Sequence, residues 1–209
     1  MYNFTFNIPT KIHFGKDTIS NLSELKAYGS KVLLVYGGGS IKKNGLYDTA
    51  MKILKDAGLT VFELSGVEPN PKIETVRKGV EICKNEGIDM VLAIGGGSTI
   101  DCSKVVAAGA KYDGDAWDLV LDGSKVKAAL PIFDVLTLSA TGTEMDPFAV
   151  ISDMSKNEKW GTGSPYMVPT MSILNPEYTF SVSKKQTAAG TADMMSHTME
   201  NYFSMENAD

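Results

Sequence analysis

The sequence contains little histidine, cysteine or tryptophan, with two of each among its 209 residues. Cys83 and Cys102 each lie in a helix-like apolar pattern, so a disulfide framework is not indicated and a reducing compartment, the cytoplasm, is expected. The opening segment, MYNFTFNIPT, has neither the basic part nor the apolar part of a signal peptide. No apolar run approaches the roughly 18 residues that a membrane-spanning helix needs, so a membrane is not expected as a partner.

The chain also lacks an excess of positive charge. Lysine and arginine total 20 residues against 25 aspartates and glutamates, which gives a net charge of −5. Without a basic block, neither nucleic acid nor an anionic membrane surface is expected to be the main partner. The apolar fraction of 43% and the charged fraction of 22% exclude disordered, collagen-like and coiled-coil chains. At roughly 100–200 residues per domain, the length predicts one full α/β domain and a remainder.

Strand-like and helix-like patterns alternate along the chain. Short apolar runs predict strands at residues 31–36, 60–64, 89–94, 133–138 and 171–174, with two more within 2–14 and a polar hairpin at 147–160. Apolar residues at helical spacing predict helices over 46–54, over 73–83 with Pro71 at the first position, through Val105 and Val106, and over 187–203. Strands that alternate with helices imply βαβ units. The pattern therefore predicts a Rossmann-like α/β fold, with a parallel sheet and helices on both faces.

Two of the predicted strands end in the same four residues, Gly-Gly-Gly-Ser, at 37–40 and 95–98. Glycine lets a ligand approach backbone amides closely, and the second turn leads straight into a helix whose first N–H groups favour a phosphate. Ligands of open α/β sheets lie at the carboxyl ends of the strands. Gly96, Gly97 and Ser98 are therefore candidates for binding a pyrophosphate.

The second glycine turn also has a purely structural interpretation. Ser98-x-x-Asp101 resembles a capping box, in which both side chains would do no more than cap the helix. Position 42 is lysine and position 100 is isoleucine, so neither turn completes the G-x-G-x-x-G fingerprint, and neither matches a P-loop. Taken alone, the motif is equally consistent with a plain tight turn and with a phosphate-binding site.

The first glycine turn bears on the choice between NAD and NADP. Sites that prefer NAD usually place an acidic side chain near the ribose hydroxyls of the adenosine, whereas Gly37 to Ser40 offers a hydroxyl and no carboxylate, with Lys42 and Lys43 nearby. If this turn faces that ribose, we expect NADP(H) to be tolerated, and a preference for it stays open. The polar stretch TLSATGTE at 137–144 follows another strand and is either a plain loop or a third border of the same site.

Asp193 and His197 are one helical turn apart in the final predicted helix. The i, i+4 spacing places both side chains on one face, and a carboxylate with an imidazole suits Fe(II), Zn(II) or Mn(II) better than Ca(II) or Mg(II). The alternative is a surface Asp–His pair without a metal. A catalytic metal needs about three protein ligands, and the other histidine, His13, belongs to the amino-terminal strands.

Taken together, the motifs resemble those of the iron-containing alcohol dehydrogenases, and of the clostridial butanol dehydrogenase branch in particular. The matching segments are IPTKIHFGK, VYGGGSIKKNGLYD, ELSGVEPNP, LAIGGGSTIDCSK, LTLSATGTEMDPFAVIS and TAAGTADMMSHTMENYFS. The resemblance implies a dinucleotide-binding α/β domain over 1–180, which includes an amino-terminal strand pair at 1–14. Residues 181–209 would begin an all-helical metal-binding domain of which the rest is missing.

The resemblance also implies roles for individual residues. Gly37, Gly38 and Ser40 would lie near the adenosine ribose, and Gly96, Gly97 and Ser98 would hold the pyrophosphate with Asp101 nearby. Thr137, Leu138, Thr141 and Lys159 would contact the cofactor. Asp193 and His197 would be two of four ligands of Fe(II) or Zn(II), the other two being histidines that this sequence lacks. No separate catalytic side chain is predicted.

The activity implied is hydride transfer between NAD(P)H and short alcohols or aldehydes such as butanol and butyraldehyde. In this interpretation the chain is an amino-terminal portion of the enzyme and is expected to be inactive alone. Met194, Met195 and Met199 of its last helix are expected to pack as core residues. That helix, over 187–203, is also expected to expose an apolar face, and a homodimer or other self-association is expected. Two alternatives stay open: an enzyme of the glycerol dehydrogenase or dehydroquinate synthase type, and a non-enzymatic nucleotide-binding module.

Overall fold

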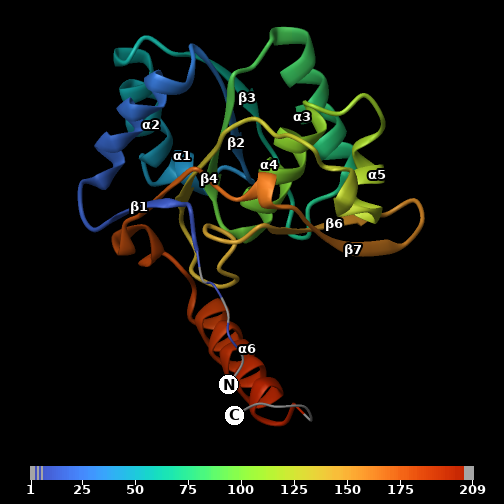
Figure 1. Cartoon of the computed structure of the whole chain (residues 1–209). Helices are drawn as coiled ribbons and strands as arrows, with labels where there is room; N and C mark the ends of the chain where they lie inside the picture. The colour runs from blue at the N-terminus through green and yellow to red at the C-terminus, as the bar shows by residue number, and fades with distance from the viewer. Residues whose placement is uncertain (1–2, 4, 6, 205–209) are drawn as a thin grey trace.

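The computed structural model describes residues 3, 5 and 7–204 (Figure 1). Its largest element is a six-stranded sheet in the order β1-β8-β5-β4-β2-β3, and every neighbouring pair is parallel. The strands are β1 (Lys11–Phe14), β2 (Lys31–Tyr36), β3 (Thr60–Leu64), β4 (Met90–Gly95), β5 (Ile132–Leu136) and β8 (Met171–Leu174). Helices lie in the connections from β2 to β5, which confirms the predicted Rossmann-like α/β fold.

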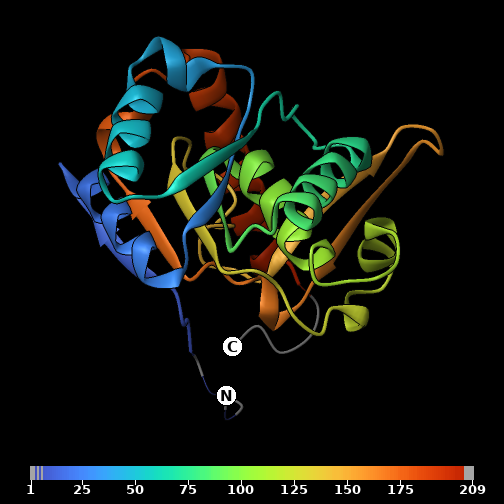
Figure 2. The same cartoon turned by 90° about the horizontal axis from the view of Figure 1, so that it is seen from above.

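Helices cover both faces of the sheet (Figure 2). The α-helices are α1 (Ser40–Lys43), α2 (Leu46–Asp56), α3 (Ile73–Glu86), α4 (Gly97–Gly109), α5 (Ala116–Leu121) and α6 (Lys184–Tyr202), and the 3₁₀-helices are η1 (Thr18–Tyr28), η2 (Gly123–Lys125), η3 (Pro165–Met167) and η4 (Pro176–Thr179). η1 and α2 cover one face, and α3, α4 and α5 cover the other. Helix α3 begins at Ile73, so Pro71 precedes it and does not occupy its first position as predicted.

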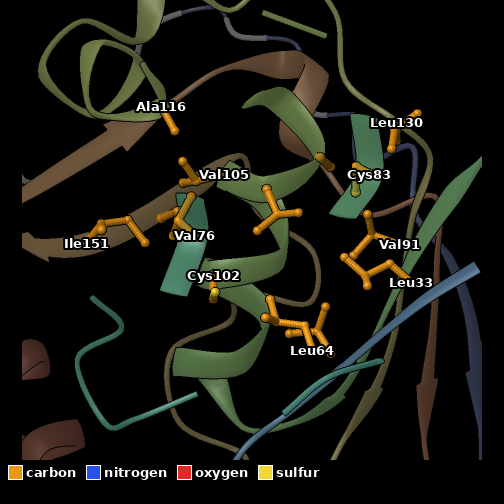
Figure 3. Packing of buried hydrophobic residues seen from close by; sticks show 14 of the residues in the cluster. Leu33, Leu64, Val76, Cys83, Val91, Cys102, Val105, Ala116, Leu130 and Ile151 are labelled. Atoms are coloured by element: carbon orange, nitrogen blue, oxygen red, sulfur yellow. The ribbon is translucent and has the colours of Figure 1, made fainter. Parts of the chain in front are cut away.

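Strand β2 shows why the sheet is covered on both faces. Alternate residues of a strand point to opposite faces. Leu33 and Val35 therefore join the core under α3 and α4, whereas Val32 and Leu34 join the core under η1 and α2. All four side chains are fully buried. Figure 3 shows the first of these cores, where side chains from the strands converge with side chains from α3 and α4.

Both cysteines lie in this core, Cys83 on α3 and Cys102 on α4 (Figure 3), and neither forms a disulfide. Burial raises the pKa of each thiol to about 12. At neutral pH both thiols are uncharged, and a buried uncharged thiol is unreactive. The two cysteines therefore act as small apolar packing residues.

The amino-terminal region differs from the expected strand pair. The structure describes one strand before η1, and this strand, β1, pairs in parallel with β8, with Lys11 opposite Met171. The expected companion strand falls partly on residues 2, 4 and 6, outside the described part of the chain. Helix η1 was not predicted. Its buried residues Ile19, Leu22 and Leu25 recur every third position, the period of a 3₁₀-helix and not of an α-helix.

Two elements lie outside the main sheet. Strands β6 (Phe148–Asp153) and β7 (Glu158–Gly163) form the predicted hairpin as a separate antiparallel sheet, and β6 packs against α4. Helix α6 projects away from the sheet (Figure 1) and has no buried residue. Met194, Met195 and Met199 are exposed, which confirms the expected apolar face; in this chain they are not core residues. Among the described helices, none is both long and apolar enough to cross a membrane.

Asp134 is a carboxyl group in the middle of the sheet, on β5, and it is fully buried. Its Oδ2 lies 2.6 Å from the Ser172 hydroxyl, which also lies 2.7 Å from the carbonyl oxygen of Glu144, and its Oδ1 has no hydrogen-bond partner. Ser172 has one proton to donate, and the carbonyl can only accept. A protonated Asp134 resolves this, because its own O–H then donates to Ser172. Burial also raises the pKa of Asp134 well above its ordinary value.

Replacing Asp134 by asparagine is expected to change how stability depends on pH. Because its pKa is raised in the folded chain, the carboxyl ionises only on unfolding at any pH between about 4 and that raised value. Wild-type stability therefore falls as pH rises through this window, whereas Asp134→Asn has no proton to lose. In urea titrations, the free energy of unfolding of the variant relative to wild type should gain about 1 kcal/mol or more between pH 4 and pH 8.

The control for this experiment is Asp113→Asn, the same substitution at an exposed position. If Asp134→Asn and wild type give parallel pH profiles, Asp134 is not neutral in the folded chain.

Candidate functional site

The carboxyl ends of β2, β4 and β5 meet at one edge of the sheet and open into a cleft of about 510 Å³. That volume is typical of small-molecule sites. Of the residues proposed to bind the cofactor, those on the cleft wall are Gly38, Ser40, Gly96, Gly97, Ser98, Thr137 and Leu138. The two Gly-Gly-Gly-Ser turns and the loop after β5, which are far apart in the sequence, therefore meet at one site.

Helix α4 begins at Gly97, and its first turn lies on the cleft wall. No side chain caps this helix at its N-cap residue, Gly96. Asp101 instead accepts hydrogen bonds from the Thr143 hydroxyl at 2.6 Å and from the Val150 amide at 2.9 Å. The capping-box interpretation of Ser98 and Asp101 is therefore wrong. The first turn of α4 has no side-chain cap where it borders the cleft, and the helix dipole favours an anion there.

Two glycines have a structural reason to be glycine. A Cβ atom on Gly97 would lie 2.9 Å from Thr141 Oγ1, closer than such atoms normally approach. Glycine at this position lets the loop after β5 pack directly on the start of α4, which places Thr141 beside the cleft wall. At the other turn, Gly39 has a φ of 98°, in the left-handed region that favours glycine, and it forms the N-cap of α1.

Two more of the proposed cofactor residues lie beside the cleft and not on its wall. The Gly37 carbonyl accepts a hydrogen bond from the Gly66 amide at 3.2 Å, which ties the first turn to the segment after β3. Lys159 comes from β7, and its Nζ donates to Asn70 Oδ1 at 2.7 Å. Pro69, the neighbour of Asn70, lines the cleft. The hairpin therefore reaches the rim of the cleft through Lys159.

A buried polar network lies behind the start of α4, and its centre is Lys104, which is fully buried. Its Nζ lies 2.8 Å from four acceptors, which share its three protons: the Thr143 hydroxyl, the carboxylate and carbonyl of Asp146, and the Phe148 carbonyl. Burial lowers the pKa of Lys104, and the Asp146 carboxylate opposes that shift. Burial raises the pKa of Asp101, and the hydrogen bond from Thr143 opposes it. Asp101 and Lys104, one turn apart on α4, thus hold the loop after β5 and the start of β6.

Asp193 and His197 lie on one face of α6. Asp193 Oδ1 and His197 Nε2 are 3.8 Å apart, and the two side chains are 59% and 65% exposed. Asp193 lines a second cavity, of about 250 Å³, which shares Leu138, Val182 and Gln186 with the cleft. The pair therefore lies next to the cleft. The described residues contain no group of three or more histidine, cysteine, aspartate or glutamate side chains that could hold a metal ion.

A family model for the iron-containing alcohol dehydrogenases matches residues 9–176, which is most of the chain. The chain belongs to the iron-containing alcohol dehydrogenase family. Among curated members, NADH-dependent butanol dehydrogenase A of Clostridium acetobutylicum is 62% identical over 205 residues, which cover 98% of this chain and 53% of the relative. An NADPH-dependent aldehyde reductase of Escherichia coli is 40% identical, with 97% of this chain and 52% of the relative covered.

Solved structures of the family agree with the fold. The crystal structure of NADH-dependent butanol dehydrogenase A from Thermotoga maritima matches with a TM-score of 0.92 at 49% identity, over 97% of this chain and 52% of that chain. In each of these comparisons the chain spans about half the length of the relative. The shared half contains the sheet, the cleft and the start of α6 described above.

Sequence reasoning missed part of the cleft wall of this alcohol dehydrogenase family member. The residues that it missed are Ile41, Asn44, Val67, Pro69, Thr99, Tyr178, Ser181, Val182, Ser183 and Gln186. Ile41, Asn44, Val67, Pro69 and Thr99 lie within the quoted family-like segments, but no cofactor role was assigned to them, and residues 178–186 lie outside every quoted segment. Position was the one available signal: Val67 and Pro69 follow a predicted strand, and strand ends line the sites of parallel sheets. Residues 178–186 reach the cleft because η4 and the start of α6 fold back across it.

We predict that Lys104→Met destabilises this family member strongly. The substitution leaves Thr143, Asp146 and Phe148 without their buried donor, and removal of one partner of a buried ion pair costs about 3 kcal/mol or more. Urea denaturation followed by circular dichroism measures the change in the free energy of unfolding. The control is Lys111→Met at an exposed position just after α4, which should cost less than about 0.5 kcal/mol. Equal stability of the two variants would show that the network contributes nothing.

Proposed function

We propose that this chain is the dinucleotide-binding portion of a metal-dependent alcohol dehydrogenase that uses NAD(P)H. Its proposed substrates are short straight-chain alcohols and aldehydes such as butanol and butyraldehyde. The observation that carries the proposal is that the uncapped first turn of α4, the turn containing Gly38 and Ser40, and Asp193 surround two adjoining cavities. Family membership supports the reaction type, and the names of the relatives support the substrate class and both cofactors.

The residues that line the cleft suggest the orientation in which the proposed cofactor binds. The pyrophosphate lies against residues 96–98, where the dipole of α4 favours negative charge. One end of the cleft is bordered by residues 38–40 after β2, and the other passes residues 137–138 toward the cavity that Asp193 lines. The nicotinamide must lie near the reacting group, so we assign it to the Asp193 end. The adenosine then occupies the β2 end.

We propose Asp193 and His197 as two ligands of Fe(II) or Zn(II), because a carboxylate and an imidazole on one helix face suit these ions. The described residues offer no further ligand beside them, so we propose that the remaining ligands come from outside the described part of the chain. When bound, the metal supplies a Lewis acid for the alcohol or aldehyde oxygen. The chain's own contribution is to hold the nicotinamide beside that position, since hydride transfer is the chemistry of the cofactor.

We also propose a cytoplasmic location and self-association. Two buried, unpaired cysteines suit a reducing compartment. The exposed methionines of α6 form an apolar surface, and a surface of this kind favours association with another one.

Cofactor binding is tested by placing a side chain at the start of α4. A valine at position 97 would collide with Thr141 and occupy the space over the amides of α4, so Gly97→Val should weaken NADH and NADPH binding by about tenfold or more. Titration of reduced-cofactor fluorescence measures both affinities. Gly161→Val is the matched control, because a Cβ there meets open space. Equal affinities in the two variants would rule out the pyrophosphate site at residues 96–98.

Metal binding is tested on the same chain. With two protein ligands, Fe(II) and Zn(II) should bind weakly, and the 209-residue chain should have negligible butanol dehydrogenase activity. Calorimetric titration with Zn(II) should show weak binding that His197→Gln abolishes. His13→Gln, which removes the other histidine from β1, should leave it unchanged. Tight stoichiometric metal in the purified wild-type chain would contradict the two-ligand interpretation.

In a longer protein that contains this chain, faster turnover of glycerol than of butanol would favour a glycerol dehydrogenase-type enzyme.

A further inference from the structure

Four side chains form a cluster at the β2 end of the cofactor cleft: Tyr36 at the end of β2, Lys42 on α1, Tyr47 on α2 and Glu63 on β3. The Tyr36 hydroxyl donates to one oxygen of the Glu63 carboxylate at 2.6 Å, and the Tyr47 hydroxyl donates to the other oxygen at 2.8 Å. A hydrogen bond to each oxygen fixes the carboxylate in place. Burial alone would raise the pKa of Glu63, but the two tyrosine hydrogen bonds and Lys42 leave this pKa below its ordinary value. Glu63 is therefore charged at neutral pH.

Lys42 is held by the same cluster. Its Nζ lies 4.0 Å from Glu63 Oε2, 4.4 Å from the centre of the Tyr47 ring and 5.0 Å from the centre of the Tyr36 ring. An ammonium group is attracted both by a carboxylate and by the faces of aromatic rings. The positive charge of Lys42 is thus already engaged within the cluster.

The position of Lys42 matters because α1 borders the cleft. Ser40 and Asn44, two residues before and two residues after Lys42, both line the cleft wall. Under the proposed function, the adenosine ribose lies at this end. NADPH differs from NADH by a 2′-phosphate on that ribose, and this dianionic group needs a cation to offset its charge. Lys42 does not line the cleft, because on a helix it lies on the side opposite Ser40 and Asn44. Its ammonium group would offset that charge only if it left Glu63 and the two tyrosine rings.

We propose that Glu63 is a specificity-determining residue that biases the cleft toward NADH. Its carboxylate, fixed by Tyr36 and Tyr47, keeps Lys42 on the tyrosine rings and also repels a 2′-phosphate. The proposal rests on the proposed function and adds the residue that discriminates between the two cofactors. That residue comes from β3 and not from the glycine turn. NADP(H) is tolerated, as expected from the lack of a carboxylate at residues 37–40, but it binds less tightly than NADH.

The experiment is a fluorescence titration of NADH and of NADPH with the 209-residue chain and its variants. Wild type should bind NADH more tightly than NADPH. In Glu63→Gln, the ratio of the NADPH to the NADH dissociation constant should fall by about fivefold or more, mainly through tighter NADPH binding. The double variant Glu63→Gln with Lys42→Gln should lose most of this gain, because the released lysine is then absent. The fall in the ratio should shrink in 0.5 M salt, where charges are screened.

Glu24→Gln is the matched control. Glu24 has nearly the same side-chain exposure as Glu63, 38% against 36%, and it pairs with Lys11 of β1. Glu24→Gln removes the same charge and should leave the ratio of the NADPH to the NADH dissociation constant unchanged. If Glu63→Gln proves unstable in thermal melts, Tyr47→Phe tests the same contact, since it frees one carboxylate oxygen and should shift the ratio in the same direction by less.

Each other outcome contradicts a stated part of the proposal. If wild type binds both cofactors and Glu63→Gln leaves the ratio unchanged, the role of Glu63 is overturned and the proposed function stands. If wild type prefers NADPH, the bias is overturned. If the double variant keeps the full gain, Glu63 acts by repulsion and the role of Lys42 is overturned. If wild type binds neither cofactor, the proposed function fails, and this inference fails with it.

Discussion

The ammonium group of Lys104 is the interaction on which the functional edge of this chain depends. A buried charge without partners would cost several kcal/mol, and α4 can bury this one because Thr143, Asp146 and Phe148 supply acceptors. All of these acceptors follow β5 in the sequence. One helix therefore contributes its first turn to the cleft wall and also holds the loop after β5 that packs on that turn.

The sheet and α6 contrast in how they are stabilised. β2 and β4 are buried on both faces by helices of this chain, so the cleft at their carboxyl ends is built on a buried core. α6 buries no residue and carries an exposed row of methionines. The cleft walls after β2 and β4 are therefore anchored in a buried core, whereas Asp193 and His197 lie on a helix that buries no residue. This difference is why we assign cofactor binding, and not turnover, to these 209 residues.

Much of the fold could be predicted because burial on both faces demands a continuous apolar run. The run at 31–36 shows this, since residues 32–36 are buried and Lys31 is partly buried. Helix η1 escaped prediction because its apolar residues repeat every three positions, between the periods of a strand and of an α-helix. Lys104 escaped because a lysine in an apolar helix pattern gives no sign of its partners, which lie about 40 residues later in the chain.

By itself, the sequence determined the parallel sheet, the two glycine turns at strand ends and the Asp193–His197 pair on one helix face, because each of these depends on local spacing. The tertiary structure decided that Asp101 supports a distant loop and does not cap its own helix, since its partners lie 42 and 49 residues away. It also decided that Lys42 is engaged by Glu63 from another strand. Contacts of this kind depend on which strands become neighbours, and no local pattern in a sequence records that.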